Sequence, residues 1–205
     1  MQTILVEKRA IQTHVLLSEL HAYTRAPYAP QLEFQSFAIL RRVLRKTAAF
    51  HRKQALSKRQ LWFGAYFQKE VLAAALPHVS LRWVSEEIGW GVFAERDFQP
   101  MEFLAEYSGL FRKREKGDEK NAYCFECPLI RGESSPYLID AQEKGGISRY
   151  INHSDAPNVE SALATVLGAP HILLITKVAV PKGAELRYDY GPDYWKRRKR
   201  SAYEP

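Results

Sequence analysis

Cysteine is scarce in this chain of 205 residues, which contains only Cys124 and Cys127. Two cysteines cannot supply the several disulfide bonds that support small secreted domains. Their C-x-x-C spacing could hold half of a zinc site, but there is no second pair, and none of the six histidines has the spacing to complete one. We therefore predict no metal site.

Long apolar runs are also missing. The longest, VLAAAL at 71–76 and ILLI at 172–175, are far shorter than the roughly 20 apolar residues that a membrane-spanning helix needs. The start of the chain, MQTILVEKRA, lacks the apolar stretch and cleavage site of a signal peptide. The sequence thus predicts an intracellular protein without membrane contact. Its location would be cytoplasmic, or nuclear if KRRKR at 196–200 acts as an import signal or if the protein is delivered into a host cell.

Negative charge is sparse at both ends of the chain. Residues 1–80 contain 12 Lys and Arg against 4 Asp and Glu, whereas residues 81–191 contain 13 against 17. Residues 192–205 are again basic, with 5 against 2. Because an acidic surface attracts basic partners and speeds their arrival, the middle region favours a basic substrate.

Proline and glycine are nearly absent between Gln31 and Leu76, where one Gly and no Pro occur. Residues with high helix propensity dominate there, and apolar residues recur at steps of three and four, as on one face of a helix. These residues are Phe37, Leu40, Val43, Leu44, Thr47 and Phe50. An earlier helix is predicted at about 4–23. We therefore expect a helical region over residues 1–80, whose apolar stripe either packs on the rest of the chain or forms a homodimer interface.

Basic side chains cover another face of the predicted helices. They are Arg41, Arg42, Arg45, Lys46, Arg52, Lys53, Lys58 and Arg59. A solvated helix surface is one interpretation, and a contact with nucleic acid or an acidic partner is the other. The basic tail at 196–205 leaves the same two interpretations open.

From Leu81 onward, short apolar runs alternate with turns that contain Gly or Pro. Examples are GWGVFAE, EFLAEYSGLF, AYCFECPLI, PYLIDA, HILLITKVAV and AELRYDYG. Strands of five to seven residues with tight turns indicate a compact β-rich domain. The sequence as a whole therefore predicts an α+β fold, with helices first and strands second.

A polar stretch, RYINHSDAPN at 149–158, interrupts these runs. It contains Ser, His and Asp, but three adjacent residues cannot hydrogen-bond in line as a catalytic triad does. Asn-His-Ser is formally a glycosylation site, which is relevant only in a secreted chain. Taken alone, the segment is most simply interpreted as a polar turn before Pro157.

Four segments in order closely resemble the motif set of SET-domain protein lysine methyltransferases. They are GWGVFA at 89–94, EYSG at 106–109, RYINHSDAPN at 149–158 and ELRYDYG at 185–191. The resemblance implies small β-sheets whose C-terminal segment threads under a preceding loop as a pseudoknot. It also implies S-adenosyl-L-methionine as cofactor and a lysine of a basic protein, histone or histone-like, as methyl acceptor. The implied organisation is a helical region at 1–80, a SET domain at 81–195 and a basic tail at 196–205.

The resemblance also implies roles for individual residues. Tyr190 would be the catalytic tyrosine, and Tyr107 would line the lysine channel. Tyr188 would retain a water that favours mono- or dimethylation over trimethylation. The cofactor would lie against Gly89, Trp90, Gly91, Tyr123, Arg149, Asn152, His153 and Trp195. Because the amine must be neutral to attack, and a free lysine has a pKa near 10.4, a narrow apolar channel would favour the reactive form.

The sequence departs from many members of that family because it has no zinc-binding cysteine segment on either side of the domain. Asp155 follows Asn-His-Ser, where those members carry a Cys. We therefore expect Tyr194 and Trp195 to close the site over the adenine and the lysine channel. The alternative, from a different class, is a basic helical protein that binds nucleic acid or another partner and carries an inactive SET-like domain.

Overall fold

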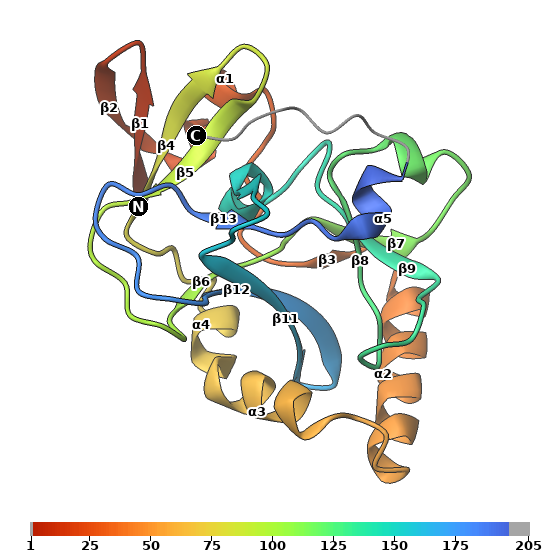
Figure 1. The fold of residues 1–205 in the computed structure, drawn as a ribbon. Helices are drawn as coiled ribbons and strands as arrows, with labels where there is room; N and C mark the ends of the chain where they lie inside the picture. The colour runs from red at the N-terminus through yellow and green to blue at the C-terminus, as the bar shows by residue number, and fades with distance from the viewer. Residues whose placement is uncertain (1, 197–205) are drawn as a thin grey trace.

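The computed structural model describes residues 2–196, in which the strands form three small sheets and the longer helices lie together at one end (Figure 1). The predicted α+β fold class is confirmed. Residues 197–205, which include most of the KRRKR stretch, lie outside the described part of the chain.

The first sheet has the strand order β2-β1-β4-β5 and joins the N-terminal segment to the strands that follow residue 80. Its strands are β1 (Thr3–Lys8), β2 (Ile11–Leu16), β4 (Val79–Ser85) and β5 (Gly89–Ala94). Strand β1 pairs antiparallel with β2 and parallel with β4. Buried residues of all four strands belong to one hydrophobic cluster, so both sides of residue 80 share a core.

The helix predicted at about 4–23 is wrong, because β1 and β2 form a β-hairpin there. Ile4 and Val6 alternate with more exposed residues and enter the core, as side chains of a strand do. The turn is formed by Arg9 and Ala10, both with positive φ, and it lacks the Gly or Asn that marks hairpins in a sequence. Two short helices end the segment, η1 (Leu17–Glu19) and α1 (His21–Thr24).

The second sheet has the order β10-β13-β11-β12-β6 and contains the C-terminal strand. Its strands are β6 (Phe103–Glu106), β10 (Asn152–His153), β11 (Val159–Val166), β12 (Ala169–Thr176) and β13 (Arg187–Tyr188). Strand β13 lies between β10 and β11, which are joined directly by residues 154–158. That connection must cross β13, so the C-terminal segment threads past the loop as the resemblance implies. Asn158 ties the crossing, since its side chain bonds the backbone of Glu185 and of Arg187 at 2.8 Å each.

The third sheet has the order β3-β7-β9-β8. Its strands are β3 (Glu33–Phe34), β7 (Leu110–Lys113), β8 (Cys124–Glu126) and β9 (Tyr137–Asp140), and two short helices lie nearby in the chain, η2 (Asp118–Lys120) and η3 (Ile147–Tyr150). Arg112 links the sheet to η2, because its guanidinium bonds Asp140 at 2.7 Å and Asp118 at 2.5 Å. The hydrogen bond from Arg112 lowers the pKa of Asp118 and keeps this carboxylate charged.

Three helices occupy most of residues 37–72, and Ser residues cap two of them. They are α2 (Phe37–Arg52), α3 (Lys58–Tyr66) and α4 (Gln68–Leu72). The Ser36 and Ser57 hydroxyls accept hydrogen bonds from backbone N–H groups three residues on, which is the usual N-cap arrangement. Of the predicted apolar stripe, Val43 and Thr47 are buried, and Val43 packs in one cluster with Phe111 and Ile172. Phe37, at the start of the stripe, is exposed.

Helix α3 lies against β11 so closely that only glycine fits at Gly64. A Cβ at this position would be 1.9 Å from the carbonyl oxygen of Thr165, a backbone atom. Gly64→Ala is therefore expected to lower the free energy of unfolding by about 3 kcal/mol, because the helix must move off the sheet. Ala65→Ser, on an exposed position of the same helix, is the control and should change it by less than about 0.5 kcal/mol. Equal urea denaturation midpoints for the two variants would contradict this packing.

Candidate active site

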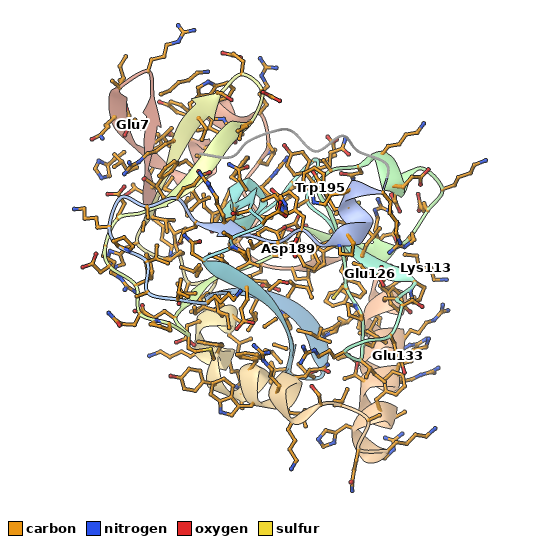
Figure 2. The ribbon with its side chains drawn as sticks, viewed as in Figure 1. Glu7, Lys113, Glu126, Glu133, Asp189 and Trp195 are labelled. Carbon is orange, nitrogen blue, oxygen red and sulfur yellow. The ribbon has the colours of Figure 1, made fainter. Side chains whose placement is uncertain are left out.

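A cavity of 1540 Å³ is lined by parts of all three sheets and by the C-terminal helix α5 (Pro192–Trp195). Figure 2 labels Asp189 and Trp195, which mark the C-terminal segment as it runs from β13 into α5. The cavity collects residues from β5, β8, η3, β10 and β13, which are distant in the sequence. The crossing of β13 between β10 and β11 brings these segments together.

Asn152 joins three of these segments through its side-chain amide. Its Nδ2 donates to the carbonyl oxygen of Trp90 at 3.2 Å and to Oε1 of Glu185 at 2.9 Å. The buried Glu185 carboxylate also accepts a hydrogen bond from Nε of Arg187 at 2.8 Å. Both N–H groups of the amide are therefore used inside the protein, and within residues 2–196 its oxygen has no hydrogen-bond partner.

His153 is held by hydrogen bonds at both ring nitrogens. Nδ1 accepts from the backbone N–H of Tyr190 at 3.2 Å, and Nε2 lies 3.3 Å from Oδ1 of Asp155. Because Nδ1 accepts, the ring hydrogen is assigned to Nε2, which then donates to Asp155. The ring also contacts that of Trp195, with 4.8 Å between centroids. His153 thus fixes the C-terminal segment and has no nitrogen left for nucleophilic or base catalysis.

Arg149 brings buried N–H groups to the cavity without an acceptor. Within the described residues, its Nε and Nη1 atoms are buried and make no hydrogen bond. Its guanidinium lies 4.1 Å from the ring centroid of Tyr123 and 5.2 Å from that of Tyr150. A buried N–H group without a partner costs folding free energy, so its position in the cavity lining indicates a site for an anionic ligand group.

Four aromatic rings form one section of the cavity wall, which we call the ring passage: Tyr107, Phe125, Tyr188 and Tyr190. Ring centroids are 5.0 Å apart for Tyr107 and Phe125, 6.2 Å for Phe125 and Tyr188, and 4.7 Å for Tyr188 and Tyr190. Aromatic faces attract cations, and their carbon atoms exclude water. The ring passage is therefore suited to a long side chain that ends in an amine.

The three tyrosine hydroxyls of the ring passage differ in their partners. The Tyr107 hydroxyl donates to the carbonyl oxygen of Tyr123 at 2.9 Å, and the Tyr190 hydroxyl to that of Ile151 at 2.9 Å. The Tyr188 hydroxyl has no hydrogen-bond partner among residues 2–196. Burial raises the pKa of Tyr107, Tyr188 and Tyr190 above the ordinary value of a phenol, so all three stay protonated at neutral pH.

Helix α5 covers the tyrosines from the C-terminal side. The Tyr194 ring lies 4.6 Å from that of Tyr190, and the Trp195 ring lies 6.3 Å from it in a stacked arrangement. Both side chains also line the cavity. Tyr194 and Trp195 thus lie beside the site, whereas their role as a lid and the contact of Trp195 with an adenine remain predictions.

The two glycines of the GWG segment are needed for different structural reasons. Gly89 has a φ of +82°, a backbone conformation that is strained in any residue with a side chain. A Cβ on Gly91 would be 2.7 Å from Oε1 of Glu185, so Gly91 leaves room for the carboxylate that holds Asn152. Gly91 is the one predicted site residue absent from the cavity lining, and the structure gives it this packing role.

Sequence reasoning missed two residues of this site, Glu185 and Phe125. Glu185 begins the ELRYDYG segment, and its buried position between Asn152 and Arg187 depends on the crossing of β13. Phe125 carried a usable signal, because it is two residues from Tyr123 and alternate residues of a strand share a face. The remaining ten predicted residues all line the cavity.

Charges on the cavity wall are mixed and show no acidic excess. The carboxylates are those of Glu86, Glu87, Asp118, Glu119, Glu126, Glu133 and Glu160. The cations are Lys8, Arg25, Arg59, Arg114, Arg131, Arg149 and Lys196. Two of these pairs are bonded, Arg59 with Glu160 at 2.8 Å and Arg114 with Glu126 at 2.7 Å. All seven carboxylates belong to residues 81–191, which supply only Arg114, Arg131 and Arg149 among the cations, so the acidic excess of this region is present on the wall and is balanced there by cations from other parts of the chain.

Residues 2–196 contain no group of three or more His, Cys, Asp or Glu side chains arranged to hold a metal ion. Burial raises the pKa of the Cys124 thiol to about 12, so it is protonated at neutral pH. None of the helices in this part of the chain has the length and apolar character needed to cross a bilayer.

A half-open cavity that joins the unbonded N–H groups of Arg149 to the ring passage has room for two different ligands, as the site of a two-substrate enzyme does. A family model described as the SET domain matches residues 89–191, which is half of the chain. The chain therefore belongs to the SET-domain family, and the resemblance seen in the sequence is confirmed.

Named relatives share this domain. Histone-lysine N-methyltransferase SETD2 of Mus musculus is 35% identical over 115 residues, which cover 52% of this chain and 4% of that protein. N-lysine methyltransferase KMT5A of Xenopus tropicalis is 36% identical over 112 residues, covering 50% of this chain and 33% of that protein. The chain thus spans a minor part of the length of these curated relatives.

One solved structure with partial similarity is the crystal structure of KRYPTONITE in complex with mCHH DNA, H3(1-15) peptide and SAH. The TM-score is 0.48 at 25% sequence identity, and the alignment covers 55% of this chain and 23% of that one.

Proposed function

We propose that this chain is a protein-lysine N-methyltransferase that uses S-adenosyl-L-methionine. The observation that carries the proposal is a single cavity that joins Arg149 and strand β10 (Asn152–His153) to the ring passage. The names of the relatives, which are lysine methyltransferases, support the same activity for this chain.

The residues present fit this cofactor. Its carboxylate would accept hydrogen bonds from the partnerless N–H groups of Arg149. The Asn152 oxygen, with its N–H groups already bonded inside the protein, would accept from the cofactor's amino group. Trp195, packed on His153, would cover the adenine. When bound, the cofactor supplies an electrophilic methyl group on a positively charged sulfur.

The ring passage would deliver the substrate lysine as a neutral amine. At pH 7 roughly one free lysine in 2,500 is neutral, which corresponds to a deficit of about 4.6 kcal/mol. Apolar walls lower the amine pKa by desolvation and recover part of that deficit. Because the tyrosine hydroxyls remain protonated, none of them serves as a base, and the amine loses its proton to water before it attacks.

Tyr190 is the proposed catalytic tyrosine because its hydroxyl is fixed. Its hydrogen is donated to the Ile151 carbonyl, so the lone pairs of Oη are left to accept an N–H of the amine. That contact would hold the nitrogen lone pair in line with the methyl group. Tyr107, fixed in the same way by the Tyr123 carbonyl, would line the lysine channel.

The proposed substrate is a basic protein of the histone or histone-like kind. The seven carboxylates that residues 81–191 place on the cavity wall support it by attracting basic side chains, although cations from other parts of the chain balance their number there. Incubation with core histones and basic bacterial proteins, using cofactor with a deuterated methyl group, tests the activity by mass spectrometry. Labelled lysine is the expected result. Lack of label in every protein would favour the alternative of an inactive SET-like domain.

The Tyr188 hydroxyl is the proposed limit on the number of methyl groups added. Without a protein partner among the described residues, it can retain a water that occupies space beside the amine. Tyr188→Phe is therefore expected to shift the main product from mono- or dimethyllysine to one more methyl group, at similar turnover. Mass spectrometry of the same peptide at equal conversion measures the shift. An unchanged product distribution would show that Tyr188 does not set the methyl count.

A further inference from the structure

Helix α2 carries a set of exposed cations that the proposed reaction does not use. None of their side chains makes an ion pair or hydrogen bond within residues 2–196. We call this set the basic face; it consists of the C-cap residue Lys53 and, within the helix, Arg41, Arg42, Arg45, Lys46 and Arg52. Unpaired like charges on one helix repel one another, so they are better explained by a partner than by the stability of the helix.

The basic face consists of two parallel rows. At 3.6 residues per turn, Arg41, Arg45 and Arg52 form one row, and Arg42, Lys46 and Lys53 form the other. Each row extends about 16 Å along the axis, at 1.5 Å per residue. The opposite side of the helix buries Val43 and Thr47, which fixes the rows toward solvent.

A second element extends the basic face. Arg42 and Lys46 share a hollow of 660 Å³ with two lysines at the end of β7. These are Lys113, the last residue of the strand, and Lys116, three residues later. Figure 2 labels Lys113 near the N-terminal end of α2. Glu115 is the one carboxylate in the lining of this hollow, and Arg114 there is bonded to Glu126 at 2.7 Å. Among residues 2–196, four cations whose side chains make no ion pair thus oppose one carboxylate in this hollow.

We propose that the basic face and this hollow bind the phosphate backbone of duplex DNA. Rows of unpaired Lys and Arg neutralise backbone phosphates and release their counterions, which drives binding. An acidic protein is less suited, because α2 exposes no large hydrophobic side chain except Phe37 in its first turn, and protein interfaces depend on such anchors. A single strand is also less suited, because no exposed aromatic ring lies between the rows to stack on bases.

The position of the hollow beside the active-site cavity suits the basic face to substrate delivery, an inference that rests on the proposed function. Arg114 lines both the hollow and the active-site cavity, so the two adjoin. DNA held on the basic face would bring a basic protein bound to the same DNA close to the ring passage. Contacts to phosphates carry no sequence information, so binding would be independent of sequence.

Fluorescence anisotropy with a labelled 25-base-pair duplex, without cofactor, tests the binding. For about six phosphate contacts, the logarithm of affinity should fall with the logarithm of salt concentration at a slope of about −5. Arg42→Gln combined with Lys46→Gln should reduce the slope to about −3 and weaken binding roughly 60-fold at 0.1 M salt. Because the tail at 196–200 is also basic, the difference between variants, and not the total slope, is the test.

The matched control is Lys69→Gln combined with Lys177→Gln, which removes the same charge from exposed positions away from the basic face. It should leave the slope unchanged. Equal losses for both double variants would overturn the proposal, as would stronger competition by polyglutamate or by a single strand than by duplex DNA. The Arg42 and Lys46 variant should also methylate free histone peptide normally but DNA-bound histone more slowly. If no methylation occurs at all, the anisotropy measurement still tests DNA binding independently of the proposed function.

Discussion

Tyr190→Phe should lower kcat about 100-fold while the affinity for cofactor changes less than twofold. The substitution removes the hydroxyl that donates to the Ile151 carbonyl at 2.9 Å and that would accept from the lysine amine. Loss of alignment between reacting groups costs this much without any change in substrate binding. Steady-state methyl transfer to a histone peptide measures kcat, and calorimetry measures the cofactor affinity.

Tyr66→Phe is the matched control, because Tyr66 is exposed and stacks on Trp62 outside the cavity. It should keep full activity. Rates of wild type and Tyr190→Phe should both rise between pH 7 and 9, as the neutral fraction of the lysine increases. Since burial raises the pKa of Tyr190, its hydroxyl does not titrate in this range, and the shapes of the two profiles should agree. Full activity of Tyr190→Phe would refute its catalytic role.

Arg149→Met should weaken cofactor binding about 50-fold, because a charge-assisted hydrogen bond to a carboxylate contributes roughly 1.5–3 kcal/mol. The same substitution should leave the melting temperature of the free protein unchanged or higher. In the free protein, the buried Nε and Nη1 atoms have no partner among the described residues, so their removal relieves a cost. Opposite signs for ligand affinity and stability are the signature of a residue retained for binding.

Arg25→Met controls for the loss of positive charge, since Arg25 also lines the cavity but is exposed. Calorimetric titration should give it a cofactor affinity close to that of wild type. If Arg149→Met instead lowers the melting temperature and binds cofactor normally, Arg149 is a structural residue held by its contact with Tyr123.

The ordered motifs of the sequence were sufficient to identify most residues that the structure brings together. Asn152 and His153 of β10, the tyrosines Tyr188 and Tyr190, and Arg149 were all predicted from ordered motifs, and all line one cavity. Glu185 was missed because its partner Asn152 is 33 residues away in the sequence, and only the crossing of β13 brings the two together. The sequence also predicts that Gly91 contacts the cofactor. The structure instead places the Glu185 carboxylate in the space beside Gly91, which again depends on the crossing of β13.

The N-terminal hairpin shows a different limit of sequence reasoning. Strands β1 and β2 are rich in Thr, Ile and Val, a strand signal that the helix prediction overlooked. Their turn at Arg9 and Ala10 carries no turn-forming residue type. Tertiary contacts decide the outcome, because β1 gains a parallel partner in β4, more than 70 residues later in the chain. The signals that predict helix α2 are local by comparison, because the cap at Ser36 and the apolar stripe both appear in its own segment of the sequence.

A crystal structure with S-adenosylhomocysteine and a lysine peptide tests the central claim most directly. The account predicts the cofactor carboxylate within hydrogen-bonding distance of Nε or Nη1 of Arg149, and the lysine amine among Tyr107, Tyr188 and Tyr190. A cofactor bound away from Arg149 and strand β10, or a lysine that reaches it by a path outside the ring passage, would contradict the account.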